Sequence, residues 1–169
     1  MKLPAICLAF VLSSSTCFAA VNTGLPQRGA LPDSQVEPDR KNPYGDMAVI
    51  DRLLEDQRYA EAIPVLERFL TKNGVEEHHR SIGYNLKGLS LFMVGRLAEA
   101  IADFTKSLEL QERAAVAAVA RWKTVFNRGL AYEAANDLAR AADDFVRAYA
   151  MAPNERRVKS KIYRFFNKE

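Results

Sequence analysis

The sequence predicts an all-α protein in which pairs of helices repeat along the chain. From Asp46 onward, apolar residues recur every three to four positions, as they do in amphipathic helices. No stretch alternates apolar and polar residues over a useful length, so no strands are expected. Similar segments begin at Ala62, Ala100 and Ala141, at spacings of 38 and 41 residues, and this regularity indicates internal repeats.

The composition is that of a globular protein with one domain of ordinary size. The chain has 169 residues, of which 49% are hydrophobic and 27% are charged. The formal net charge of +3 is too close to balance to indicate a polyanionic partner, so no nucleic acid is expected.

Residues 1–19 are predicted to be a secretory signal peptide. Lys2 provides a positive start, residues 3–12 are mostly apolar, and Cys17 and Ala19 place small residues where signal peptidase requires them. A membrane span needs roughly 20 apolar residues, about twice this run. We therefore expect export, to the periplasm, with cleavage near Ala19. The alternatives are an uncleaved or buried N-terminal helix and a lipoprotein, although Ser14 stands where a lipoprotein signal has leucine.

Both cysteines, Cys7 and Cys17, would leave with the signal peptide. Residues 20–45 are then expected to form a flexible linker, because they are rich in proline and glycine and contain few large apolar residues. Order on the surface of the domain is the alternative.

Residues 46–169 are predicted to form the helical domain. In the first pair, the apolar positions of residues 49–54 and 62–70 are separated by a charged break at 55–58. Pro64 falls about one turn into the second helix, where it removes a backbone hydrogen bond. Residues 155–168 are predicted to be a terminal capping helix that begins at Asn154 as N-cap and buries Val158, Ile162 and Phe165.

The spacing of small and aromatic residues resembles that of the tetratricopeptide repeat family. Gly129 lies twelve residues before Ala141, which is followed four residues later by Phe145. The second repeat has Gly88, Ala100 and Phe104 at the same spacing, and the first has Ile50, Ala62 and Leu66. The resemblance covers roughly residues 43–154, with repeats at 43–76, 81–114 and 122–155.

The resemblance implies a right-handed superhelical stack of about three helix pairs plus the capping helix. Gly88 and Gly129 would lie where the two helices of a pair approach closely, and Gly95 and Asn136 suit the turn within a pair. The repeats are farther apart than the 34 residues of the family. We expect the surplus around residues 108–124 to add about one turn to each of the two facing helices.

The resemblance also implies a partner and a binding site. In this family the first helices of the pairs line a concave groove that holds a peptide or helix of another protein. The groove residues expected here are Asn85, Leu89, Phe92, Lys123, Phe126, Asn127 and Leu130. The alternative for any of the apolar ones is burial between helices. Only Lys123 matches the clamp by which some members hold a C-terminal carboxylate, so binding of that type is not expected.

No catalytic constellation is recognisable. The mature chain would have no cysteine nucleophile, and no serine lies in a Gly-x-Ser-x-Gly turn. His78 and His79 follow two glutamates, but adjacent helical residues point about 100° apart and chelate a metal poorly. Asp143 and Asp144 are expected on a solvated face. We therefore expect no enzymatic activity, no metal and no cofactor.

The function expected is that of a non-enzymatic adaptor or scaffold, in envelope or secretion-system assembly, that binds a partner protein in its groove. The alternative is a small inhibitor or immunity protein that occludes a toxin or enzyme. The basic capping helix is expected to be a solvated cap, with an acidic protein or an anionic lipid headgroup as alternative ligand, so membrane contact is at most peripheral. The sequence leaves the oligomeric state open, and also whether the linker occupies the groove.

Overall fold

The computed structural model describes residues 44–167, and this part of the chain consists of helices joined by short turns. The predictions for the signal peptide and for all but the end of the linker fall on residues 1–43, outside the described residues. The helices are α1 (Met47–Glu55), α2 (Tyr59–Thr71), α3 (Glu77–Met93), α4 (Leu97–Arg113), α5 (Ala118–Ala134), α6 (Leu138–Met151) and α7 (Arg156–Phe166).

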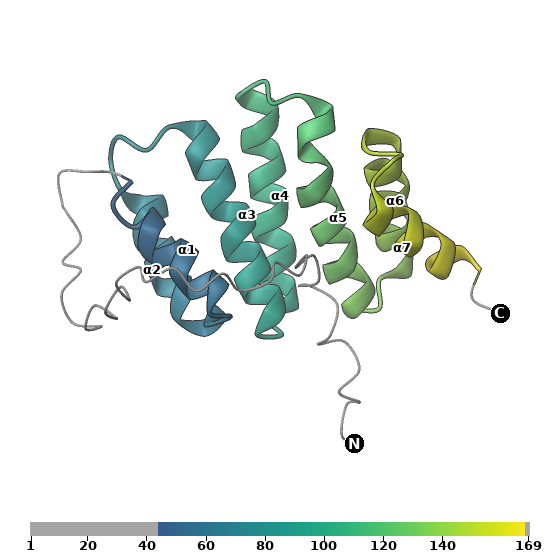
Figure 1. The fold of residues 1–169 in the computed structure, drawn as a ribbon, viewed down its shortest axis with the longest axis horizontal. Coiled ribbons are helices and arrows are strands. Elements are labelled where there is room, and N and C mark those ends of the chain that lie inside the picture. The colour runs from purple at the N-terminus through teal and green to yellow at the C-terminus, as the bar shows by residue number, and fades with distance from the viewer. Residues whose placement is uncertain (1–43, 168–169) are drawn as a thin grey trace, which may run out of the picture. The chain divides into compact units, whose positions relative to one another are not determined.

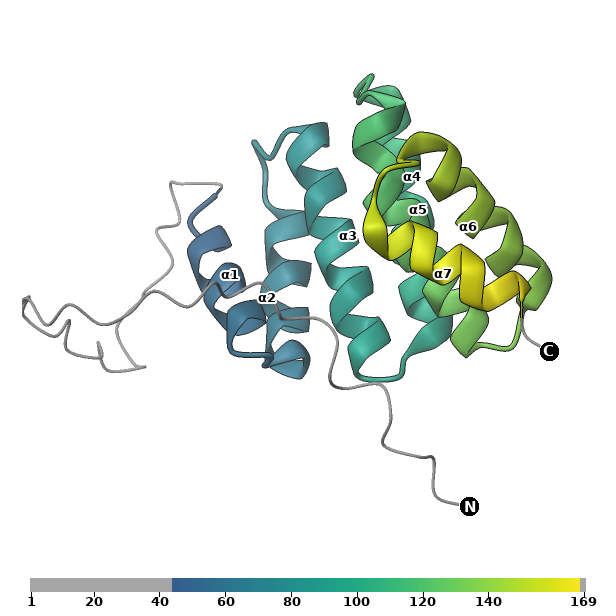
Figure 2. The same cartoon turned by 45° about the vertical axis from the view of Figure 1, so that its right-hand side comes forward.

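The helices pack in the predicted pairs. α1 packs against α2, α3 against α4 and α5 against α6, while α2–α3 and α4–α5 contacts join each pair to the next (Figure 1). α7 packs against α6 at the C-terminal end, which Figure 2 brings forward. The predicted all-α stack of three helix pairs with a capping helix is confirmed.

The turn within each pair contains one residue in the left-handed backbone region. Gly95 has a φ of 84° and Asn136 a φ of 61°, as predicted for these two positions. In the first pair the residue is Gln57, with a φ of 59°. The sequence gave no indication of it, because glutamine is not a typical left-handed residue.

The two predicted glycine contacts are present in the second and third pairs. A Cβ atom on Gly88 would lie 2.9 Å from the ring of Phe104, and one on Gly129 would lie 2.8 Å from the ring of Phe145. The first pair has Ile50 in the glycine position and is fully buried there. Its partner position has the smaller Leu66 in place of phenylalanine, so the volume at the contact is redistributed.

The predicted lengthening of the facing helices α4 and α5 is also found. Each has 17 residues, against 13 in α2 and 14 in α6. α3 has 17 residues as well, which was not predicted. The chain leaves α4 without glycine or proline, because Ala115 adopts the left-handed region with a φ of 51°.

Two predictions of local structure are wrong. Asp144 does not lie on a solvated face: the residue is 3% exposed, because its carboxylate binds Arg128 between helices. The N-cap of α7 is Glu155 and not Asn154, and its side chain makes no capping hydrogen bond.

The start of the domain is held by a buried carboxylate. Asp46 is fully buried and forms ion pairs with Arg68 at 3.0 Å and with Lys72 at 2.9 Å. Tyr44, within the range expected for the linker, packs against the first core cluster and stacks on His79. Arg80 then fixes the α2–α3 loop by donating hydrogen bonds to the carbonyl oxygens of residues 70, 72 and 75.

Candidate functional site

The seven predicted groove residues all lie on the first helices of the second and third pairs. α3 contributes Asn85, Leu89 and Phe92, and α5 contributes Lys123, Phe126, Asn127 and Leu130. α3 and α5 contact one another directly. The fold therefore places these residues on two neighbouring helices.

The seven residues differ in how far they are available to a ligand. Lys123 is exposed and the other six are half-buried. Leu89 and Phe92 pack against the core cluster that includes Leu91 and Phe104. These two side chains therefore stabilise the stack in addition to bordering its surface.

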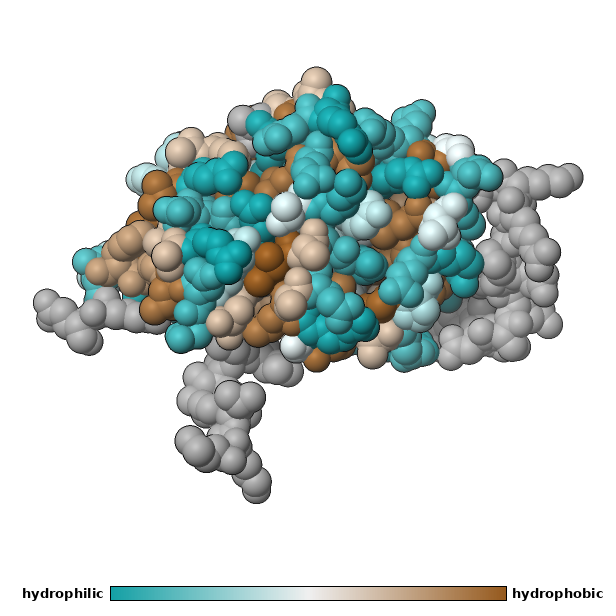
Figure 3. Space-filling view, turned by 180° about the vertical axis from the view of Figure 1, so that it is seen from behind, coloured by the Kyte–Doolittle hydropathy of each residue, from teal (hydrophilic) through white to brown (hydrophobic). Residues whose placement is uncertain are grey.

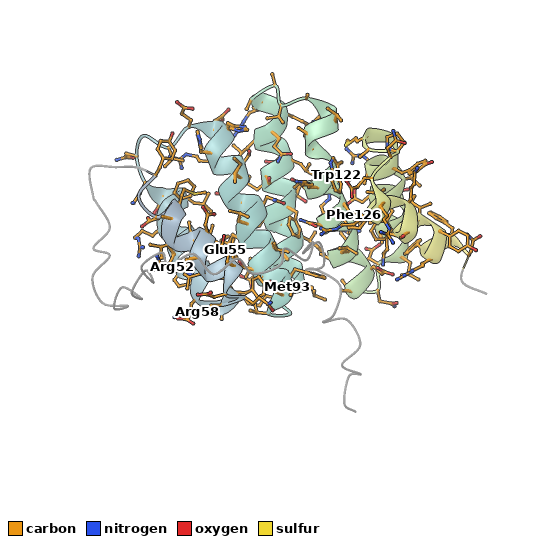
Figure 4. The ribbon with its side chains drawn as sticks, in the orientation of Figure 1. Arg52, Glu55, Arg58, Met93, Trp122 and Phe126 are labelled. Carbon is orange, nitrogen blue, oxygen red and sulfur yellow. The ribbon has the colours of Figure 1, made fainter. Side chains whose placement is uncertain are left out.

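Phe126 belongs to the contact between the third pair and the capping helix. Its ring centroid lies 5.8 Å from that of Phe145 and 6.3 Å from that of Trp122, one turn earlier on α5 (Figure 4). Ile162 from α7 packs against the same clusters. Phe126 is therefore largely engaged in packing.

Leu89 and Leu130 occupy equivalent positions on their helices. Each directly follows the glycine that contacts the second helix of its pair, so each side chain points about 100° away from that contact. Lys123 and Asn127 lie two turns and one turn before Leu130, on the same side of α5.

The structure adds two apolar residues to this surface that the sequence analysis missed. Met93 lies one turn after Leu89 and its side chain is 38% exposed, and Val119 lies one turn before Lys123 and is 63% exposed. The four-residue spacing from residues already selected could have identified both. We name the α3–α5 face by its six residues: Leu89, Met93, Val119, Lys123, Asn127 and Leu130.

Charged residues border this face at one end. Arg52 and Glu55 of α1, and Arg58 at the start of α2, lie toward the same end of the helices as Met93 (Figure 4). The face itself contains one charged residue, Lys123, whose ammonium nitrogen lies 5.8 Å from the centre of the Trp122 ring. The arrangement is an apolar surface with few charges and a polar edge.

Asn85 is a polar residue beside the apolar ones. Its side-chain oxygen is buried and has no hydrogen-bond partner within residues 44–167. An amide oxygen in this situation can accept a hydrogen bond from a backbone N–H of a bound segment.

The other side of the stack differs in character. Figure 3, viewed from behind relative to Figure 1, shows mainly hydrophilic residues with small hydrophobic areas between them. Across residues 44–167, no group of three or more His, Cys, Asp or Glu side chains is placed to hold a metal ion. In the same range, no helix combines the length and the apolar character needed to cross a membrane.

Comparisons with known proteins agree with this fold. The tetratricopeptide repeat family model matches residues 83–113, which cover most of α3 and all of α4. A solved structure of the first TPR of Spaghetti (RPAP3), bound to the HSP90 peptide SRMEEVD, superposes with a TM-score of 0.63 at 16% sequence identity. The match covers 78% of this chain and 95% of that one. No curated protein sequence matches the chain. The described helices thus form a tetratricopeptide-type stack, and residues 83–113 have the sequence of a tetratricopeptide repeat.

Proposed function

We propose that this chain is a non-enzymatic interaction module that binds an apolar extended or helical segment of another protein on the α3–α5 face. The observation that supports this most directly is the exposure of Met93 and Val119, which extend the apolar positions of Leu89 and Leu130 on two neighbouring helices. Apolar side chains gathered on such a surface are a common basis of peptide recognition.

The chemistry of the face suggests the kind of segment it binds. Lys123 is its one charged residue, so it offers no cluster of cations for an acidic tail or a terminal carboxylate. The RPAP3 domain with a similar fold binds the acidic HSP90 peptide named above. We propose a different type of ligand here, one with apolar anchors and a backbone N–H that reaches the oxygen of Asn85.

We further propose that the module acts after export, in envelope or secretion-system assembly. Residues 1–19 support this, with Lys2, the apolar run and the small residues Cys17 and Ala19. Mass spectrometry of the protein from the periplasm should give a chain beginning at Ala20. A chain that retains Met1 in the cytoplasmic fraction would contradict export.

The binding face is tested by affinity capture from an envelope extract. The parent chain is compared with a Met93→Glu, Val119→Glu double variant, in which both changes are at exposed positions and should leave the fold intact. Ala98→Glu with Ala102→Glu, at exposed positions of α4, adds the same charge outside the α3–α5 face. We expect one protein to be captured by the parent and the control and lost with the face variant. Retention of that protein by the face variant would show that the face is not the site.

A further inference from the structure

Exposed hydrophobic side chains are concentrated at the C-terminal end of the stack. Of eight large hydrophobic residues that are exposed among the described residues, five lie on α6 and α7. We call these five the C-terminal apolar surface: Leu138, Val146, Tyr149, Tyr163 and Phe166. α6 and α7 pack against one another, so the five residues belong to adjacent helices (Figure 2).

The α6 part of this surface corresponds to positions that are covered in the other pairs. Leu70, Leu108 and Tyr149 each lie eight residues after the small alanine of their own repeat. Leu70 is 6% exposed and contacts the backbone of α3 at Gly83, and Leu108 is 7% exposed in a cluster with Val125 of α5. Tyr149 is 40% exposed. The position that contacts the next pair is therefore partly uncovered at the end of the stack.

The α7 part corresponds to positions that face the second helix of a pair. Tyr163 and Phe166 each lie 34 residues, one family repeat length, after Gly129 and Tyr132. Gly129 contacts Phe145 of α6, and Tyr132 packs in a cluster with the same residue. At the equivalent positions of α7, Tyr163 is 71% exposed and Phe166 is 53% exposed.

α7 uses its other side to join the stack. Val158 is fully buried, Ile162 and Phe165 pack against the third pair, and Lys161 forms an ion pair with Glu133 of α5. Tyr163 and Phe166 consequently lie on the side of α7 that the second helix of a fourth pair would cover.

The charge of this end indicates the character of what covers it. Residues 138–166 contain seven basic and three acidic residues, although the whole chain is nearly balanced. Four exposed cations of α7 have no ion-pair partner within residues 44–167: Arg156, Arg157, Lys159 and Arg164. A second copy of the chain, docked end to end, would bring these like charges together, which is unfavourable. An acidic partner complements them.

We propose that the C-terminal apolar surface binds an acidic amphipathic helix of another protein, in the position that an eighth helix of the stack would occupy. Two adjacent helices with apolar stripes fit a third helix better than they fit a flat membrane surface. Because Tyr163 replaces the glycine of the equivalent contact, the bound helix must present a small residue opposite it. This surface is separate from the α3–α5 face, and the proposal does not depend on the function proposed above.

A peptide with the sequence of residues 97–113 is a suitable probe. As α4, this sequence already packs on a first helix of the stack, with the small Ala100 opposite Gly88, and it contains four acidic and two basic residues. The control peptide has lysine in place of Glu99, Glu109 and Glu112, which are all exposed in α4. Each peptide is titrated into the isotope-labelled full chain, and backbone amide shifts are followed by NMR.

We expect the acidic peptide to shift amides of α6 and α7, and the lysine peptide to bind at least about tenfold more weakly because it removes the charge complementarity. A Tyr163→Ser, Phe166→Ser variant should weaken binding of the acidic peptide about tenfold or more. Val94→Ser, at an exposed apolar position of neither surface, should not. Equal binding of both peptides, or shifts confined to α3 and α5, would overturn the proposal.

Two further measurements separate the other occupants of this surface. Sedimentation with vesicles containing phosphatidylglycerol, and sedimentation equilibrium of the chain alone, are both repeated with the Tyr163→Ser, Phe166→Ser variant. Vesicle binding or self-association that requires these aromatics, without binding of the acidic peptide, would assign the surface to a membrane or to a second copy and contradict the proposal.

Discussion

Arg128 and Asp144 form a two-fold hydrogen-bonded ion pair between α5 and α6. The Nε and Nη2 atoms of Arg128 donate to the two carboxylate oxygens at 2.8 and 2.9 Å, and Nη1 donates to Thr105 of α4 at 3.1 Å. The hydrogen bonds to Asp144 raise the pKa of Arg128 despite its burial, so the guanidinium stays charged. One side chain thus links three helices.

Removing Asp144 should destabilise the domain strongly. The side chains of Arg128 and Asp144 are 13% and 4% exposed, so Asp144→Ala leaves a nearly buried cation without its counter-ion. We expect a loss of about 3–5 kcal/mol in the free energy of unfolding, measured by urea denaturation. The neighbouring Asp143 is exposed, and Asp143→Ala should change the value by less than about 0.5 kcal/mol. Equal effects of the two substitutions would rule out this role of the pair.

The second pair of helices contains a weaker version of the same contact. Lys87 and Asp103, one residue before the glycine and three after the alanine as Arg128 and Asp144 are, lie 3.1 Å apart. Burial raises the pKa of Asp103, and the hydrogen bond and charge of Lys87 offset this only in part. The first pair has Val49 and Val65 at these positions, both packed against the apolar core.

The valines of the first pair predict that the Lys87–Asp103 pair is replaceable. Lys87→Val alone should cost about 1–3 kcal/mol at pH 7, because it leaves the carboxylate of Asp103 nearly buried and unpaired. The Lys87→Val, Asp103→Val double variant should be as stable as the parent or more stable. The single variant should recover as the pH is lowered, because the raised pKa of Asp103 favours its neutral form in the folded state. Urea denaturation at several pH values checks both, and a double variant less stable than the single one would refute the idea.

Asp46 should give the opposite pH dependence. Burial acts to raise its pKa, but hydrogen bonds from Arg68 and Lys72 and their positive charges outweigh this, and the pKa is lowered. A lowered pKa in the folded state contributes stability above the unfolded-state pKa of about 4, and this contribution disappears as the pH falls through the folded-state value.

Asp46→Asn should therefore destabilise the domain by about 1.5–3 kcal/mol at pH 7, and the difference from the parent should shrink between about pH 5 and pH 2. Thermal unfolding followed by circular dichroism over this range measures it. Asp56→Asn, at an exposed position, is the control for the loss of one negative charge. A constant difference between Asp46→Asn and the parent at all pH values would contradict the assignment.

The fold was predictable because it depends on residues whose function in packing is local and regular. Gly88 and Gly129 lie opposite Phe104 and Phe145 in the structure, as their twelve- and four-residue spacings to the repeat alanines indicated. Gln57 and Ala115 were not predictable, because neither residue type favours the left-handed backbone that both adopt.

The candidate site was less predictable from the sequence for a physical reason. Helical periodicity identifies a side of a helix but not which neighbour covers that side. Phe126 has the spacing of a groove residue, yet it packs toward Phe145 and the capping helix. Met93 and Val119 lie near helix ends, where exposure depends on how far the adjacent helices extend.

The two glycine positions of a repeat should respond differently to alanine. At Gly129, a Cβ atom would lie 2.8 Å from the ring of Phe145, which is fully buried and cannot move aside, so Gly129→Ala should cost about 1–3 kcal/mol. At Gly95 there is space, but the φ of 84° disfavours any Cβ, and Gly95→Ala should cost about 1–2 kcal/mol. Asparagine distinguishes the two causes, because Asn136 adopts the equivalent left-handed turn of the third pair. Gly95→Asn should regain most of the stability in urea denaturation, whereas Gly129→Asn should lose more than Gly129→Ala. Recovery at both positions would mean that the α5–α6 contact is not limited by the Phe145 ring.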